Sequence, residues 1–255
     1  MSDYKEERQK ILLNANPTMR ELFERKSVRA FSEREISEDE KKQILYAAAE
    51  APTAGCQQLY TVLDITDPEK KKALAESCDH QPFIEKAPLV LVFCSDCLRW
   101  LNAYSEAGLS PRKPGAGDFL LSLTDTAIAA QNAVTAAWSL GIGSCYIGDI
   151  LENAEIQKEI LLLPEYVVPT VMVVFGFPTE QQKEREKPSR FAIENVVFEN
   201  SYPKQDGNDL REMFAKRCGE LPFDEWIEKF CNRKYESDFS KEMNRSAEKH
   251  LEQFR

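Results

Sequence analysis

The chain has 255 residues, of which 42% are apolar and 30% charged, a balance that allows a sizeable core in one long domain. Its formal net charge of −10 argues against a nucleic-acid partner, whose phosphates are bound through many lysines and arginines. No apolar run approaches the roughly 18–20 residues of a membrane span, and the charged amino end does not resemble a signal peptide. We therefore expect a cytoplasmic protein without a membrane partner.

The seven cysteines are odd in number and scattered, as expected of free thiols in a reducing compartment. Cys94 and Cys97 form a CxxC motif directly after the apolar run 89–93. Because no second CxxC or paired histidine completes a metal site, we interpret this motif as a strand end, with a redox or metal role as the alternative. The two histidines, His80 and His250, are too few for a histidine-rich metal centre.

The first part of the chain predicts helices around a short basic segment. Residues 1–24 have the apolar spacing of one or two helices. The basic segment, residues 25–31, then places three cations and a hydroxyl close together in an acidic chain. Such groups make charge-assisted hydrogen bonds to phosphate, so a phosphate site is one interpretation and a solvated helix end is the other.

A second helix is predicted from a capping box formed by Ser37 and Glu40, and it ends near Pro52. The loop after it, residues 51–58, consists of small and amide side chains. Small residues let a ligand approach the backbone, and glutamine amides can read hydrogen-bonding edges.

The middle of the chain alternates strands and helices. Period-two or continuously apolar runs predict strands, and helices are predicted between them. The predicted strands are 60–66, 89–93, 145–147 and 167–176, and the predicted helices are 67–74 and 153–161. The glycine- and proline-rich stretch 105–118 is either a mobile loop over a site or a surface excursion.

One further helix is predicted from Ser122 to Leu140, with Ser122-Leu123-Thr124-Asp125 as its cap and Gly141 as its end. It is apolar on nearly every face, so neighbouring elements or a second subunit must cover it. Its polar residues Gln131 and Asn132 need partners.

Gly141 and Gly143 do not form a dinucleotide fingerprint, because they follow a helix and position 146 is tyrosine. A second cationic stretch ends the charged run 180–190. The sequence predicts an α+β fold in a single domain, residues 1–255, in which about 200–255 form a helical carboxyl-terminal extension.

Taken together, these segments resemble the nitroreductase family of FMN-dependent oxidoreductases, most closely its oxygen-insensitive NADPH nitroreductase and NADPH–flavin reductase branch. The resemblance rests on the order and spacing of many short motifs. They are Arg25-Lys26-Ser27-Val28-Arg29-Ala30-Phe31, His80-Gln81, Val92-Phe93-Cys94-Ser95-Asp96 with Arg99, Asp125-Thr126-Ala127, Ala130-Gln131-Asn132-Ala133, Gly141-Ile142-Gly143, Tyr146-Ile147-Gly148, Leu163-Pro164, Lys187-Pro188 and Glu199-Asn200-Ser201-Tyr202.

The resemblance implies a mixed central sheet flanked by helices and a homodimer with FMN at the subunit interface. It assigns the FMN phosphate and ribityl end to Arg25, Lys26 and Ser27, together with Lys187 and Arg190. It places the other cofactor-binding residues around the flavin ring: Arg29 at the pyrimidine edge, Gln81 on the isoalloxazine, Ile147, Gly148 and Asp149 near N5, and Thr53, Gly55 and Gln58 beside the ring. No catalytic side chain is implied, because the flavin performs the redox chemistry.

The sequence departs from the family pattern at three places. The loop at Thr53 has fewer hydroxyls than is usual, and Asp149 stands where close relatives have glycine. The carboxyl-terminal loop that supplies arginines for the NADPH 2′-phosphate matches poorly, with Arg233 and Lys234 as the candidate replacements.

The function implied is NADPH- or NADH-dependent reduction of nitroaromatics, quinones or free flavin by a ping-pong cycle. One alternative is a specialised relative such as a flavin-destructase or reductive dehalogenase. Others are a flavin-binding or redox-sensing protein without turnover, and a purely structural dimer.

Overall fold

A computed structural model describes residues 4–255 and divides the chain into two compact units. The larger unit comprises Arg25–Arg185 with Glu242–Arg255, and the smaller comprises Met1–Glu24 with Glu186–Lys241. The single-domain organisation stays a prediction. No helix among residues 4–255 is long and apolar enough to cross a membrane.

The larger unit is built on a four-stranded sheet in the order β1–β2–β4–β3. All four predicted strands are confirmed, as β1 (Tyr60–Asp64), β2 (Leu89–Asp96), β3 (Gly143–Ile147) and β4 (Val167–Gly176). Every neighbouring pair is antiparallel. The sheet is thus antiparallel, and the mixed central sheet that the family resemblance implies is wrong on this point. An isolated parallel bridge joins Ser27, which lies outside the strands, to Ser144.

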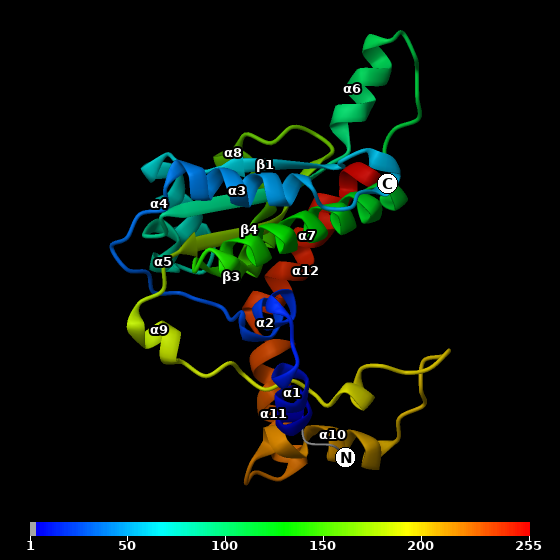
Figure 1. Cartoon of the computed structure of the whole chain (residues 1–255). Coiled ribbons are helices and arrows are strands. Elements are labelled where there is room, and N and C mark those ends of the chain that lie inside the picture. The colour runs from blue at the N-terminus through cyan, green and yellow to red at the C-terminus, as the bar shows by residue number, and fades with distance from the viewer. Residues whose placement is uncertain (1–3) are drawn as a thin grey trace. The chain divides into compact units, whose positions relative to one another are not determined.

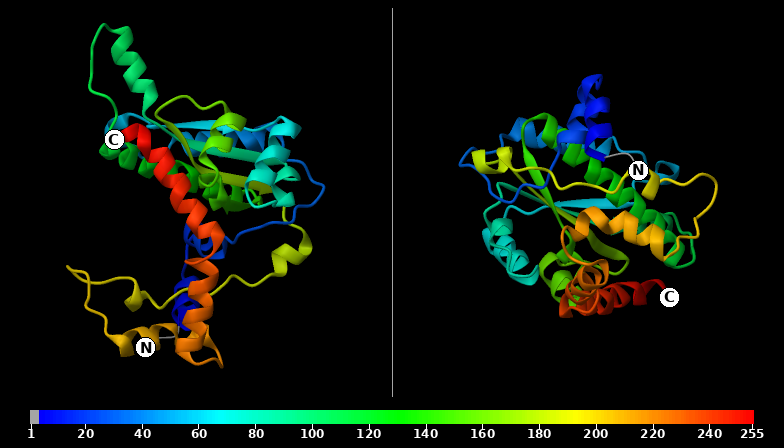
Figure 2. Two further views of the ribbon diagram at one scale, coloured as in Figure 1. Left: turned by 180° about the vertical axis from the view of Figure 1, so that it is seen from behind. Right: turned by 90° about the horizontal axis from the view of Figure 1, so that it is seen from below.

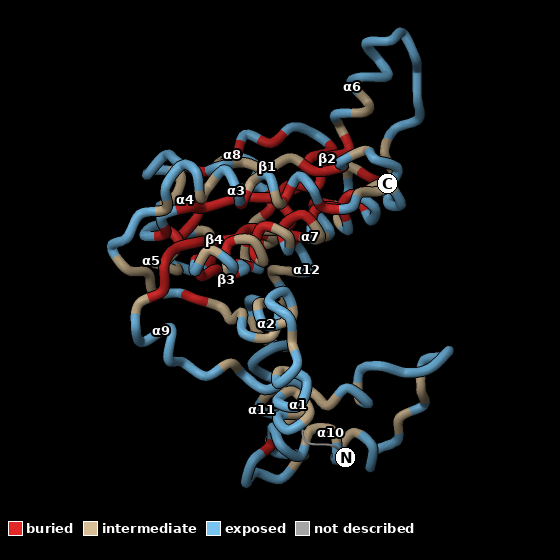
Figure 3. The backbone as a smooth tube through the Cα atoms, in the orientation of Figure 1, coloured by how far each residue is buried: buried red, intermediate tan, exposed pale blue. Residues whose placement is uncertain are grey.

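Helices cover both faces of the sheet (Figure 1; Figure 2). Successive residues of β2 point to opposite faces, as the pleat of a strand requires. Leu91 and Phe93 pack with α3 (Glu38–Ala49) and α7 (Ala116–Ser139). Val90 and Val92 pack on the other side. The elements there are α4 (Pro68–Ser77), α5 (Pro82–Glu85) and α8 (Ala154–Leu161). The central strands β2 and β4 are accordingly buried along almost their whole length (Figure 3).

Local signals account for several boundaries. The predicted capping box is present: Glu40 N donates to Ser37 Oγ at 3.3 Å, and Ser37 N donates to Glu40 Oε2 at 2.8 Å. Pro169 lies within β4, between β2 and β3, where the pairing register shifts at Phe93 and Cys94. The missing N–H of proline is tolerated at such an irregularity.

The long helix α7 begins at Ala116, so the predicted cap at Ser122–Asp125 is wrong. Its amino end lies at Gly115, whose N–H donates to the Asp118 carboxylate at 2.8 Å. Ser122 and Asp125 are buried inside the helix, and their polar groups bond to another segment. The predicted loop 105–118 is shorter in the structure, because its first residues belong to α6 (Leu98–Glu106).

The larger unit also contains the short helix α9 (Glu180–Glu184). Residues 4–255 include four 3-10 turns. The turns are η1 (Ala54–Cys56), η2 (Gly148–Leu151), η3 (Ile193–Asn195) and η4 (Glu252–Phe254).

The smaller unit is helical, as predicted for the carboxyl-terminal part of the chain. It contains α1 (Tyr4–Leu13), α2 (Pro17–Glu24), α10 (Gly207–Cys218), α11 (Phe223–Lys234) and the first residues of α12 (Asp238–Leu251). Its apolar centre is a chain of ring contacts, with centroid separations of 5.0 to 6.2 Å. The rings belong to Phe191, Phe214, Phe223, Trp226 and Phe230.

Two paired glycines let the basic segment lie against the sheet. Gly143 of β3 faces Gly176 of β4. A Cβ atom built at Gly143 would lie 2.5 Å from Cγ2 of Val28, and one at Gly176 would lie 2.5 Å from the ring of Phe31. The absence of both side chains is therefore what gives Val28 and Phe31 their places.

Gly143→Ala should lower the free energy of unfolding by about 1–3 kcal/mol, because the added methyl group overpacks Val28. Gly117→Ala is the matched control: nothing lies within 4 Å of a Cβ there, so this change in α7 should be neutral or slightly stabilising. Urea titrations of both variants measure the difference. Equal stabilities would contradict the close contact between Gly143 and Val28.

Candidate functional site

The basic segment runs beside β3. Ser27 forms the bridge to Ser144, and Val28 N donates to Ser144 O at 2.9 Å. Val28 is fully buried, whereas Arg29 is exposed. The alternation anchors the segment through Val28 and leaves its cations at the edge of the sheet.

Lys26 is bound to backbone carbonyls. Its Nζ donates to Lys183 O at 2.5 Å and to Arg185 O at 2.6 Å. Arg185 returns a bond from Nη2 to Ser27 O at 2.5 Å. These three bonds tie residues 26–27 to the end of α9. Because neutral carbonyls, rather than carboxylates, accept the bonds, the positive charges of Lys26 and Arg185 are not cancelled there.

Three polar atoms in or beside this segment are buried without a hydrogen-bond partner in the described chain, 4–255: Arg25 Nη1, Ser144 Oγ and Thr179 Oγ1. Buried donors without partners cost free energy, so such atoms mark places where a ligand would complete the bonding. Arg29 lies close to Cys145: burial raises the pKa of this thiol, and the positive charge of Arg29 opposes the rise.

The turn that follows β3 carries three predicted residues. Ile147 ends the strand and is buried, and Gly148 and Asp149 begin η2. Glu152, at the end of this turn, is 6% exposed. Burial, with the nearby carboxylate of Asp149 as the next cause, raises the pKa of Glu152 to about 7.

Gln81 lies near this turn. It precedes α5, and its Nε2 donates to Cys78 O at 2.9 Å. The pKa of the buried Cys78 thiol is raised to about 12, first by burial and then by the charge of Asp149. The residues 78–81 and the turn at Asp149 are thus close enough to interact electrostatically.

The loop with Thr53, Gly55 and Gln58 is held mainly by its own polar groups and by α7. The Thr53 hydroxyl donates to Asp125 and accepts from Gln58 N at 2.7 Å. Gln58 Nε2 donates to Ala49 O at 3.3 Å. The Thr53 hydroxyl and the Gln58 amide are therefore engaged within the protein, whereas Gly55 offers only backbone.

The remaining predicted residues belong to the smaller unit. Lys187 Nζ donates to Phe23 O at 2.9 Å, and Arg190 Nη1 donates to Pro188 O at 3.0 Å. Arg233 and Lys234 end α11, where the Arg233 guanidinium lies 5.3 Å from the Phe230 ring centroid. These contacts join Lys187, Arg190 and Arg233 to neutral groups of their own unit.

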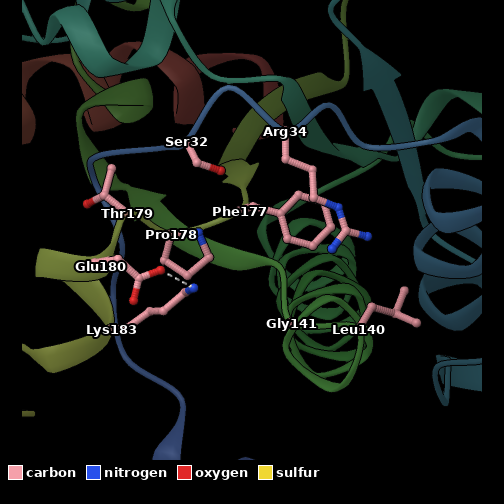
Figure 4. A pocket seen from close by; sticks show the side chains of 9 residues that line it. All are labelled: Ser32, Arg34, Leu140, Gly141, Phe177, Pro178, Thr179, Glu180 and Lys183. Atoms are coloured by element: carbon pink, nitrogen blue, oxygen red, sulfur yellow. Dashed lines mark hydrogen bonds and ion pairs between the residues drawn. The ribbon is translucent and has the colours of Figure 1, made fainter.

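Two cavities of the larger unit lie outside the predicted set. One, of about 550 Å³, has Phe177 beneath the Arg34 guanidinium, 3.7 Å from the ring centroid, with Thr179 and Ser32 on its wall (Figure 4). The other, of about 320 Å³, lies between Trp100 and Arg112. Neither is lined by a residue that the sequence predicted for the cofactor.

The CxxC motif is a strand end, as interpreted from the sequence. Cys94 lies in β2 and Cys97 follows it, and both are buried free thiols. Burial raises the pKa of Cys94 to about 12 and that of Cys97 to about 11, so neither forms the reactive thiolate readily. No group of three or more candidate metal ligands occurs among residues 4–255.

Sequence reasoning missed three residues that the structure places next to predicted ones: Arg185, Ser144 and Asp125. Arg185 stands in a run of alternating charges that gives no local signal. Ser144 looks like an ordinary strand residue. Asp125 was interpreted as part of a cap, although its position inside an apolar helix is itself an indication of a specific partner.

Comparisons with known proteins agree on one family and fold. The model of the Nitroreductase family matches residues 22–177. The FMN reductase (NADPH) of Bacillus subtilis is 32% identical over 189 residues, which are 73% of this chain and 75% of that protein. The oxygen-insensitive NADPH nitroreductase of Salmonella typhimurium is 31% identical over 218 residues, 83% of this chain and 88% of that protein.

Solved structures show the same architecture. The structure of NfrA1 nitroreductase from B. subtilis superposes with a TM-score of 0.73 at 28% identity, covering 89% of this chain and 98% of that one. The NADPH:FMN oxidoreductase of Vibrio harveyi, complexed with NAD+, gives a TM-score of 0.79 at 24% identity over 92% and 98% of the two chains. The predicted fold class is confirmed.

Proposed function

Because the chain belongs to the nitroreductase family, we propose that it is an FMN-dependent oxidoreductase that oxidises NADPH or NADH and reduces nitroaromatics, quinones or free flavin. The observation that carries this proposal is the group of uncancelled cations beside β3, with Arg25 Nη1 and Ser144 Oγ buried and without partners. The relatives named FMN reductase and NADPH nitroreductase support the same activity.

The residues present fit FMN. Its phosphate needs several charge-assisted donors, and Arg25, Lys26 and Ser27 supply them from one segment. Arg185 is added to this set, because it bonds to Ser27. Lys187 and Arg190 belong to the smaller unit, and the phosphate contact that the family resemblance implies for them stays a prediction.

FMN, when bound, accepts a hydride from the nicotinamide and passes two electrons to the acceptor. The chain's part is to bind and orient it. Arg29 is exposed at the end of the basic segment, where its charge would favour electron density at the pyrimidine edge. The backbone N–H groups of Gly148 and Asp149 would serve the ring nitrogen, and the buried Ile147 excludes water behind them.

Asp149 gives this site a carboxylate beside the buried carboxyl of Glu152. The carboxylate of Asp149 near the ring would repel an anionic acceptor. We therefore propose neutral nitroaromatics and quinones as the better substrates. The cytoplasmic location stays a prediction.

We also propose that the enzyme is a homodimer with FMN at the interface. Helix α7 exposes the apolar side chains of Leu120 and Leu121, at 60% and 52%. Leu109 and Tyr104 are exposed in the same part of the chain. Exposed apolar groups near one another favour a protein interface. A second copy would cover them and supply the missing side of the cofactor site.

The dimer should survive at micromolar concentration, because obligate interfaces commonly bury more than about 2,000 Å². Sedimentation velocity measures this. The double change Leu120→Glu with Leu121→Glu should produce monomer, whereas Leu162→Glu, at a residue 77% exposed at the end of α8, should not. A folded wild-type monomer loaded with FMN would overturn the proposal.

The purified protein should release FMN, and not FAD, on heating, and NADPH or NADH should bleach its flavin absorbance in stopped-flow experiments. A quinone should then restore the absorbance rapidly. A flavin-binding sensor would lack this rapid reoxidation, and a structural dimer would be colourless. Chromatography of the released cofactor decides between FMN and FAD.

Arg190 and Arg29 should have separable effects. Arg190→Ala should weaken FMN binding about ten- to a hundredfold, since a charge-assisted bond is worth about 1.5–3 kcal/mol. The reduction potential should barely change, because a phosphate contact is the same in both redox states. Arg29→Ala should instead lower the two-electron potential by about 30 mV if about 1.4 kcal/mol is lost from the reduced state alone.

A potential titration and an FMN dissociation constant for each variant measure these two effects. Loss of oxidised FMN from Arg29→Ala at an unchanged potential would assign Arg29 to the phosphate instead.

A further inference from the structure

The loop between α3 and β1 has an unusual backbone. Gly55, Cys56 and Gln58 have φ values of 56°, 56° and 48°, in the left-handed region. Glycine adopts that region freely, but residues with side chains do so at a cost and keep it only where their surroundings hold them. Two of the three residues here carry side chains, so something outside the loop must hold it.

Asp125 of α7 supplies that support. Its carboxylate is 3% exposed. It accepts the Thr53 hydroxyl, the Ala54 N–H at 3.0 Å and the Leu59 N–H at 3.3 Å. The Thr53 hydroxyl in turn accepts the Gln58 N–H at 2.7 Å, so one carboxylate organises donors from both ends of the loop.

The chemistry of the group suits this task. An ionised carboxylate only accepts hydrogen bonds, and three donors converge on it. One turn earlier on the same face of α7, Ser122 Oγ donates to Leu59 O at 2.5 Å, which satisfies a carbonyl at the same end of the loop. The remaining contacts, from Arg99 and Trp100 of α6, go to the carbonyls of Gln58 and Gln57.

We propose that Asp125 is a positioning residue, which fixes the loop 53–59 in a strained form and thereby sets the protein surface beside the cofactor. The inference rests on the proposed function in one respect, namely that Thr53, Gly55 and Gln58 lie beside FMN. The hydrogen bonds of Asp125 are made with the loop, at Thr53, Ala54 and Leu59.

The direct test uses Asp125→Asn. This change keeps the shape of the side chain, but it replaces an accepting oxygen with an NH2 group that faces the hydrogen-bond donors of the loop. Thr126→Val is the matched control, because Thr126 is the next residue of α7, is equally buried, and bonds to Ser122 O and Ser95 rather than to the loop. Amide hydrogen exchange at Ala54, Gln58 and Leu59 should be about tenfold or more faster in Asp125→Asn and unchanged in Thr126→Val.

Kinetics test the consequence for the site. In Asp125→Asn, kcat/KM for a quinone should fall about tenfold or more, with FMN still bound, because small misplacements near reacting groups are costly. Thr126→Val should retain the wild-type value. Faster loop exchange with unchanged turnover and FMN affinity would overturn the positioning role. If the protein binds no FMN, the proposed function fails, and hydrogen exchange still decides whether Asp125 holds the loop.

A second pair of variants covers the case in which Asp125→Asn does not fold. Thr53→Val removes the hydroxyl that links Asp125 to Gln58, and Thr53→Ser keeps it. Thr53→Val should reproduce the faster amide exchange at Gln58, and Thr53→Ser should retain the wild-type exchange rate. Equal behaviour of the two variants would contradict the proposal.

Discussion

The candidate site depends on two glycines, whose lack of a side chain makes room for the basic segment beside the sheet. Gly143 and Gly176 face each other across β3 and β4, and Val28 and Phe31 occupy the space that larger residues would fill. Because protein interiors are close-packed, the space that these glycines leave determines where the basic segment, residues 25–31, can lie. Its cations consequently stand beside β3, a few residues before the turn at Gly148. Without the glycines, the basic segment could not lie against β3 and β4.

The cations of the site differ from those elsewhere on the surface. Arg245 pairs with Glu155 at 2.9 Å, and Arg112 pairs with Asp118, so their charges are largely cancelled. Lys26 and Arg185 instead donate to backbone carbonyls, which hold the side chains in place without neutralising them. In a chain with a net charge of −10, this leaves a local positive potential available to an anion.

Helix α7 connects the parts of the site through its few polar residues. Gln131 accepts a bond from the Tyr146 hydroxyl of β3 at 3.2 Å, and Asn132 donates to Ala47 O of α3 at 3.1 Å. Asp125 holds the loop after α3. Asp125, Gln131 and Asn132 therefore each have a hydrogen-bond partner on a different element.

The sequence by itself determined the family, the four strands and the capping box at Ser37, and each of these is confirmed. It also determined where the basic segment lies along the chain. They depend on short-range patterns: alternation in strands, caps within one turn, and charges close together along the chain. Whether the basic segment binds FMN phosphate stays a prediction.

Tertiary structure alone decided what Ser122 and Asp125 do, because their partners lie 63 to 72 residues away. It likewise decided that Lys26 bonds to the carbonyls of Lys183 and Arg185, more than 150 residues distant. A serine and an acid three residues apart suit a helix cap and a buried loop support equally well. Only folding, which brings one set of donors within reach, distinguishes the two.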